Sequence, residues 1–145
     1  MAVAALLDCA AGNIRRAGLS QRVRTLPGDL NEELPAGFDV IMFCDVGSLS
    51  KRLLRSAYKK LPAGGLVVLA DRYLSEDGTQ PLDRLVEHFA GSSFGLATWK
   101  DMVLAVGSCG FADVKAENVY RAVWYITSVK PAGRARQSSG NNGQH

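Results

Sequence analysis

Two residues with chemically useful side chains, Cys44 and Asp45, stand at the end of an apolar run in the middle of the chain. The run covers residues 38–45, FDVIMFCD, and has almost no polar interruption. Such a run is typical of a strand that is covered on both faces in a parallel α/β sheet. Open sheets of this kind bind their ligands at the carboxyl ends of the strands. We therefore predict a central strand over 38–45, with a ligand beside Cys44 and Asp45.

The segments around this run alternate between helix and strand patterns. Apolar residues at helical spacing predict a first helix over about 4–17, ended by Gly18-Leu19, and residues 22–26 form a short strand candidate. After the central strand, a helix with Ser48 or Ser50 as its N-cap reaches Pro62. The apolar run 66–70 predicts a second buried strand, so the order strand, helix, strand implies a right-handed parallel crossover.

The last third of the chain predicts two helices, a hairpin and a tail. Pro81 suits the first position of a helix, whose apolar stripe comprises Leu82, Leu85, Val86 and Phe89. Thr98 to Asp101 is close to a capping box and begins a further helix. The strand-like segments 112–117 and 120–129 are so close together that only an antiparallel hairpin can join them. Residues 130–145 have the composition of a disordered tail.

Charge and cysteine usage argue against several classes of protein. Three of the 17 basic residues stand in the last sixteen residues, which contain no acid, so the remainder has 14 bases and 14 acids. This balance argues against nucleic-acid binding, which needs a basic face. Three scattered cysteines without a CxxC pair argue against a disulfide framework and a zinc site, and they fit a reducing, cytoplasmic location. No apolar run is long enough to span a bilayer.

Several short motifs follow one another in an order that is informative as a set: NIRRAGLS at 13–20, Gly28-Asp29, LPAGFDVI at 34–41, LPAGG at 61–65, Asp71-Arg72, EDG at 76–78 and Gly110-Phe111. Together they resemble the bacterial small-molecule O-methyltransferases, which are class I S-adenosylmethionine-dependent methyltransferases. The similarity covers most of residues 4–129. It implies an α/β fold in which an incomplete Rossmann-like sheet has parallel strands, flanking helices and a C-terminal antiparallel hairpin.

The resemblance also implies a cofactor, S-adenosylmethionine, and residues that contact it. The family's Gly-Asp motif places its acid near the adenine, which here implies Gly28 and Asp29, with Leu30 beside them. The end of the next strand borders the cofactor and the reacting centre, which implies Cys44 and Asp45. Carboxylates suit a cofactor that has a positive methyl donor and an adenine amino group.

The chain departs from the family in two respects. Its fifteen glycines include no pair separated by one residue, so the glycine-rich GxG loop is absent, and no carboxylate stands near Ala2, where the family's ribose-binding acid would align. The loop 46–50 is short and has no histidine, although the family uses a histidine there as general base. We therefore expect a truncated enzyme and assign no catalytic residue.

Simpler interpretations of the same residues stay open. Asp29 could be a turn aspartate that bonds its own backbone, and Asp45 could cap the next helix or face water. Cys44 is more simply a small core residue than a reactive thiol. His88 fits the flank of a helix surface better than a catalytic role.

Two functional hypotheses follow. The first is methyl transfer from S-adenosylmethionine to a small-molecule hydroxyl, and the alternative is a non-catalytic Rossmann-like module for structure or assembly. We expect no nucleic-acid or membrane partner. Because the central strand would lie at a sheet edge with unpaired backbone groups, we expect residues 22–26, a second copy or a complementing chain beside it.

Overall fold

The computed structural model describes residues 2–29, 34–46, 49–91 and 96–132, in two compact units, Met1–Glu33 and Leu34–His145. Unit 1 contains helix α1, Ala2–Arg16. The N–H of Leu19 donates to the carbonyl of Ile14, and Gly18 has a φ of 68°, so the helix ends in the glycine motif that the sequence predicts.

The strand expected at 22–26 does not form. The N–H groups of Arg22 and Val23 both donate to the carbonyl of Leu19, at 2.9 Å, and close a turn behind the helix. These two backbone donors are therefore used within unit 1 and are satisfied by the local turn. The prediction that this segment pairs with the central strand was wrong.

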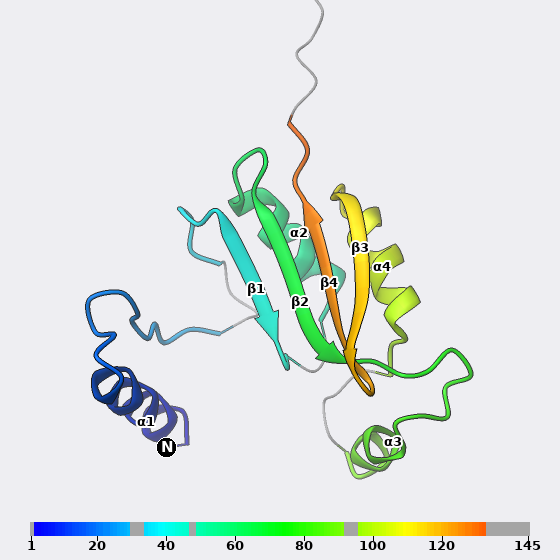
Figure 1. Cartoon of the computed structure of the whole chain (residues 1–145), viewed down its shortest axis with the longest axis horizontal. Coiled ribbons are helices and arrows are strands. Elements are labelled where there is room, and N and C mark those ends of the chain that lie inside the picture. Colours follow the sequence, from blue (N-terminus) through cyan, green and yellow to red (C-terminus); the bar gives the residue numbers. More distant parts are fainter. Residues whose placement is uncertain (1, 30–33, 47–48, 92–95, 133–145) are drawn as a thin grey trace, which may run out of the picture. The chain divides into compact units, whose positions relative to one another are not determined.

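Unit 2 is a four-stranded mixed sheet with helices on one face (Figure 1). Its strands are β1 (Val40–Cys44), β2 (Leu66–Arg72), β3 (Ala112–Tyr120) and β4 (Val123–Val129), in the spatial order β1-β2-β4-β3. β1 and β2 are parallel, whereas β4 is antiparallel to both β2 and β3. The predicted parallel pair and C-terminal hairpin are confirmed.

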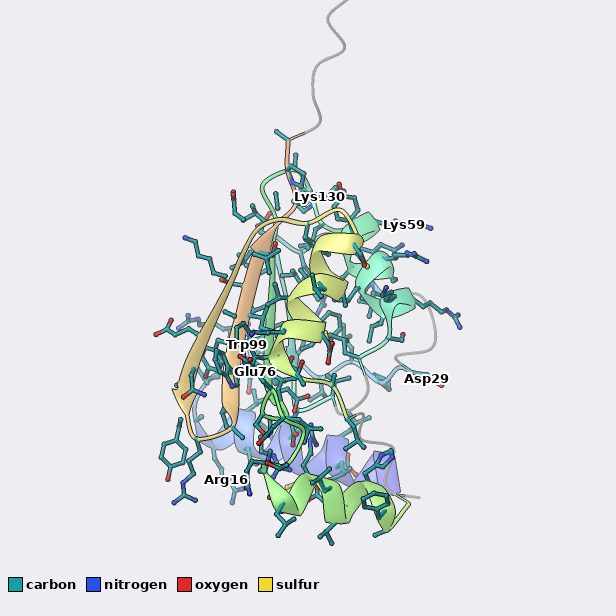
Figure 2. The ribbon with its side chains drawn as sticks, turned by 90° about the vertical axis from the view of Figure 1, so that its right-hand side faces the viewer. Arg16, Asp29, Lys59, Glu76, Trp99 and Lys130 are labelled. Carbon is teal, nitrogen blue, oxygen red and sulfur yellow. The ribbon has the colours of Figure 1, made fainter. Side chains whose placement is uncertain are left out.

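Three helices connect these strands, namely α2 (Lys51–Lys60), α3 (Leu82–Phe89) and α4 (Trp99–Ser108). Ser50 is the N-cap of α2, which decides between the two serines that the sequence left open. Pro81 is the N-cap of α3 and not its first residue, and its side chain makes no capping bond. The view in Figure 2 shows α2 and α4 on the same side of the sheet.

The core lies between that side of the sheet and the two helices, and it comprises Phe43, Leu53, Leu54, Ala57, Leu61, Val67, Leu69, Tyr73, Met102, Val106, Phe111 and Ile126. β1 contributes to it from one face alone, since Phe43 is 5% exposed whereas Val40 and Met42 are 50% and 53% exposed. The expectation that β1 is covered on both faces was therefore wrong for the described residues of unit 2. An apolar run cannot by itself distinguish one covered face from two.

Most of the stripe expected on α3 also faces outward, because Leu82, Val86 and Phe89 are 62%, 60% and 82% exposed, whereas Leu85 is half-buried. The buried residue of this helix is Arg84.

At the opposite end of unit 2, the backbone of Lys130 exchanges hydrogen bonds with Gly64 and Gly65, both at 2.8 Å. Residues 133–145, most of the predicted tail, lie outside the described residues.

Helix α4 begins with the predicted capping box, which gives a first testable prediction. The N–H of Asp101 donates to the Thr98 hydroxyl at 3.1 Å, and the N–H of Thr98 donates to the Asp101 carboxylate at 3.0 Å. We expect Thr98→Ala to lower the free energy of unfolding by about 1 kcal/mol near neutral pH, measured by urea denaturation.

The same box predicts a pH dependence. Two hydrogen bonds from Thr98 lower the pKa of Asp101 below its ordinary value of 3.8. The bond from the Thr98 side chain has the larger effect and the bond from its backbone the smaller. A carboxylate whose pKa is depressed in the folded state stabilises the fold at any pH above its ordinary pKa. This contribution is lost as the pH falls through the folded-state pKa. The stability difference between the wild type and Asp101→Asn should accordingly shrink below pH 3.8. A difference that stays constant there would contradict the role of the charged cap.

Candidate functional site

The carboxyl ends of β1 and β2 lie side by side, as expected for a ligand-binding edge. The N–H of Asp45 donates to the carbonyl of Ala70 at 3.0 Å, which joins the two strand ends. Asp45 has a φ of 49°, a left-handed conformation that aspartate and asparagine tolerate better than most residues. Its exposed side chain therefore stands at the point where the chain leaves the sheet.

The predicted cofactor residues belong to both units. Gly28 and Asp29 are exposed residues of unit 1, and Leu30 lies outside the described residues. Cys44 and Asp45 are exposed residues of unit 2. None of the four described residues lines either of the two cavities described below.

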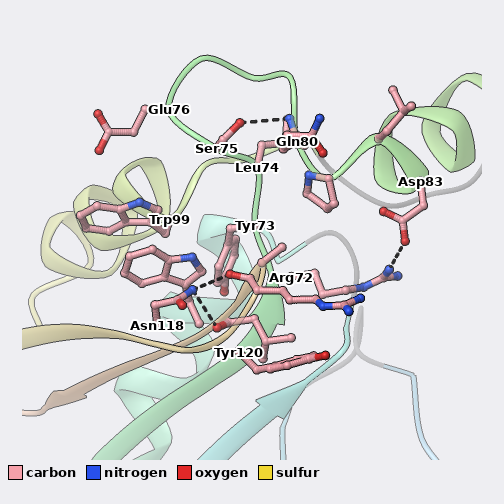
Figure 3. Close-up of a pocket in the computed structure, with 16 residues that line it drawn as sticks. Arg72, Tyr73, Leu74, Ser75, Glu76, Gln80, Asp83, Trp99, Asn118 and Tyr120 are labelled. Carbon is pink, nitrogen blue, oxygen red and sulfur yellow. Dashed lines mark hydrogen bonds and ion pairs between the residues drawn. The ribbon is translucent and has the colours of Figure 1, made fainter.

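The larger cavity is a cleft of about 980 Å³ between the end of β2, the start of α3 and the turn of the β3-β4 hairpin (Figure 3). It is lined by residues 72–76, 80–83, 99, 118 and 120–124. Its size is at the upper end of the range for small-molecule sites, about 300–1,000 Å³. The hairpin wall is fixed by Asn118, whose amide donates to the carbonyls of Arg121 and Val123 at 2.7 and 3.3 Å.

Four aromatic side chains contribute to this cleft. Trp99 and Trp124 stack with their ring centroids 4.5 Å apart, and Tyr73 and Tyr120 are the other two. Burial, followed by the charge of Asp71, raises the pKa of Tyr73 above its ordinary value, so its hydroxyl stays protonated at neutral pH. Tyr73 can thus donate a hydrogen bond but is no general base at neutral pH.

The charged residues of the cleft are mostly engaged with each other. Arg72 bonds Asp83 at 2.8 Å and lies 3.5 Å from Glu87. Glu76 pairs with Lys100 at 2.8 Å, and Figure 2 shows Glu76 close to Trp99. Arg121 lies over the ring of Tyr120, 5.1 Å from its centroid, and forms no salt bridge with any described residue. Among the described residues, the cleft therefore has one cation, Arg121, that no carboxylate pairs with.

A second cavity of about 330 Å³ lies beside a buried ion pair. Arg84 donates to the Asp71 carboxylate at 2.8 Å, with side chains 2% and 9% exposed, and also to the carbonyl of Arg72 at 3.1 Å. The two charged residues that end β2 thus bind oppositely charged residues of α3. This network attaches a helix whose apolar residues are largely exposed.

Sequence reasoning did not assign several residues of these cavities to a site, namely Tyr73, Arg84, Tyr120, Arg121 and Trp124. Trp99, an apolar residue of the first turn of α4 that is most simply interpreted as a core residue, is partly buried at the cleft wall. His88 is exposed on α3, as predicted. The available signal was the clustering of Asp71-Arg72 and the hairpin turn at one edge, which becomes visible once the sheet order is known.

Two features are absent from the described ranges. Within them, no three His, Cys, Asp or Glu side chains are grouped so that they could hold a metal ion. None of the described helices combines the length and apolar content that crossing a membrane requires.

Known proteins give a consistent comparison, although the chain matches no protein-family model. It is 31% identical over 128 residues to the L-tyrosine C(3)-methyltransferase of Streptomyces lavendulae. The crystal structure of the S-adenosylmethionine-dependent methyltransferase SibL superposes with a TM-score of 0.70 at 26% identity. This chain is a homologue of class I S-adenosylmethionine-dependent methyltransferases. The predicted family and fold are confirmed.

The methyltransferase homologue spans only part of its relatives. The match covers 83% of this chain but 30% of the tyrosine enzyme, and 87% of this chain but 41% of SibL. The fold alone is shared with a putative O-methyltransferase from Nostoc punctiforme, at 20% identity and a TM-score of 0.74, over 86% of this chain and 42% of that one.

Proposed function

We propose that this homologue takes part in methyl transfer from S-adenosylmethionine to the hydroxyl of a small molecule. The observation that carries the proposal is the 31% identity to a curated methyltransferase over 83% of the chain. The ligand-binding edge supports it, because the ends of β1 and β2 are adjacent and a cleft of small-molecule size opens beside the end of β2. The comparisons do not favour an inert structural module.

The residues present fit the charge of the proposed methyl donor. Asp45 has an exposed carboxylate at the end of β1, and Asp29 has one in unit 1. Carboxylates accept hydrogen bonds from the adenine amino group and offset the sulfonium charge, and the cofactor when bound supplies the electrophilic methyl group. We propose a role in cofactor binding for Gly28, Asp29 and Leu30 of unit 1 and, separately, for Cys44 and Asp45 of unit 2.

No general base is assigned. Among the described residues, His88 is exposed on α3 and Tyr73 stays protonated. Catalysis would therefore rest on holding the acceptor hydroxyl in line with the methyl group, an effect worth up to about 7–11 kcal/mol when the alignment is good.

A second acceptor type follows from the name of the curated relative, which specifies methylation at C(3) of L-tyrosine. We propose ring-carbon transfer as the alternative to hydroxyl transfer. A phenol hydroxyl donates electron density to the adjacent ring carbon, so one bound phenol could present either nucleophile. Nuclear magnetic resonance of a methylated product would distinguish the two.

Location and assembly belong to the same proposal. All three cysteines are free, which fits a reducing cytoplasm. β1 has a single strand neighbour, β2, among the described strands. Association at this edge, with a second copy or a complementing chain, stays a prediction.

Calorimetric titration of S-adenosylmethionine and its demethylated product tests the donor site. We expect Asp45→Asn to weaken binding roughly tenfold or more, because it removes the charge while asparagine keeps the left-handed backbone. Asp39→Asn, at the other end of β1, is the matched control and should leave the affinity unchanged. No heat at millimolar ligand would refute donor binding by this chain.

A further inference from the structure

The cleft of about 980 Å³ belongs entirely to unit 2, so a ligand there does not depend on unit 1 or on the donor. None of the residues proposed to hold S-adenosylmethionine lines it. Its walls are ordered by contacts within the protein, namely the Trp99–Trp124 stack and the Asn118 bonds across the hairpin. A cleft with such fixed walls is preorganised for a ligand.

Its aromatic residues select a flat ring. One face of Trp124 stacks on Trp99, and Arg121 lies over the ring of Tyr120, so the cleft already contains both stacking and cation–π geometry. Aromatic rings packed in offset or edge-to-face arrangements gain about 0.5–1.5 kcal/mol beyond their burial. A benzene-sized or larger aromatic ring therefore suits these walls better than an aliphatic group.

The rim of the cleft selects the charge of the ligand. Arg121 has no salt bridge with a described residue and can bind a carboxylate. Asp83 and Glu76 supply acids to the same cleft, and both side chains are 60% exposed, so each retains access to a further cation. Arg72 is already bound by Asp83 and approached by Glu87. The rim thus carries both signs of charge, which a zwitterion requires.

We propose that this cleft binds an aromatic amino acid in its zwitterionic form, with its carboxylate at Arg121 and its ammonium group at Asp83 or Glu76. The ring lies against the wall formed by Trp124, Tyr120 and Tyr73. Naming this ligand as the methyl acceptor rests on the proposed function, but its binding does not.

Both tryptophans of the chain, Trp99 and Trp124, line the cleft, so tryptophan fluorescence reports on this cavity. The full chain is titrated with L-tyrosine without any methyl donor, and calorimetry on the same samples detects binding that leaves the fluorescence unchanged. We expect saturable binding by L-tyrosine and L-phenylalanine. Tyramine, which lacks the carboxylate, and desaminotyrosine, which lacks the amine, should each bind roughly tenfold more weakly or worse. L-leucine should not bind.

Arg121→Gln tests the assignment of the carboxylate. It should weaken L-tyrosine roughly tenfold and leave tyramine unchanged, because tyramine has no group for Arg121. Arg55→Gln, on the exposed face of α2 outside the cleft, is the matched control and should alter neither.

Three results would overturn the proposal. The first is that millimolar L-tyrosine changes neither the tryptophan fluorescence nor the heat measured by calorimetry. The second is equal affinity for L-tyrosine and its two truncated analogues. The third is that Arg121→Gln weakens the binding of L-tyrosine and of tyramine equally. Because no donor is present, these outcomes are independent of a failure to bind S-adenosylmethionine.

Discussion

Replacement of Arg84 by methionine is expected to lower the free energy of unfolding of unit 2 by about 3–5 kcal/mol. Arg84 is 2% exposed and pairs with Asp71, which is 9% exposed, at 2.8 Å. Methionine keeps most of the side-chain volume but leaves the Asp71 carboxylate buried beside an apolar group. Removing one partner of a buried ion pair costs more than the pair contributes, because the remaining charge stays desolvated. Urea denaturation monitored by circular dichroism measures the effect.

The neighbouring pair provides the control. Arg72 bonds Asp83 at the same distance of 2.8 Å, but these side chains are 32% and 60% exposed. Arg72→Met should therefore cost no more than about 1 kcal/mol. The double variant Asp71→Asn, Arg84→Met should recover part of the loss, since it removes the buried charge. If Arg84→Met costs no more than Arg72→Met, the ion pair does not hold α3 to the sheet.

The second large effect is expected in the core. Leu54 of α2 is 0% exposed, and Leu54→Ala should lower the free energy of unfolding by about 2–5 kcal/mol, the sum of lost burial and a residual cavity. The cost depends on how far the surrounding side chains can move inward. A lower denaturant midpoint with an unchanged m-value would show that the substitution reduces stability and does not change the compactness of the folded or unfolded state.

Leu104 of α4 is the matched control, because it is also a helical leucine but is 72% exposed. Leu104→Ala should change the free energy of unfolding by no more than about 0.5 kcal/mol, the usual limit for surface substitutions. A large effect of Leu104→Ala would show that the outer face of α4 is covered in solution, and it would place a partner there.

These stability effects bear on the candidate site, because the same contacts position it. The Arg84–Asp71 pair fixes α3 against the end of β2, and the first residues of α3 line the larger cleft. A variant that releases α3 should therefore weaken ligand binding in the cleft as well as stability. Arg55→Gln, outside the cleft, should leave ligand binding unchanged and serves as the control for this indirect loss.

Much of the fold was predictable because local rules act on it. The Thr98–Asp101 capping box, the Gly18 helix end and the C-terminal hairpin depend on neighbours in sequence, and all three form, although the hairpin turns at residues 121–122 and not before Tyr120. Parallel pairing of β1 and β2 followed from the intervening helix. The strand predicted over residues 22–26 was wrong, because the N–H groups of Arg22 and Val23 bond the carbonyl of Leu19 in a turn behind α1.

The sequence by itself determined the class of fold, the family and the order of the elements from the central strand onward, since hydrophobic periodicity, capping residues and motif order are local properties. The tertiary structure decided which residues meet: β1 is covered on one face, Arg84 and not the apolar stripe of α3 is buried, and the aromatic cleft joins residues from 72 to 124. Burial and site geometry depend on contacts between segments far apart in the chain, and periodicity contains no information on which segments those are. Asp45 shows both sides of this division, because the sequence placed it at a strand end, whereas its exposure and its position outside the cleft required the fold.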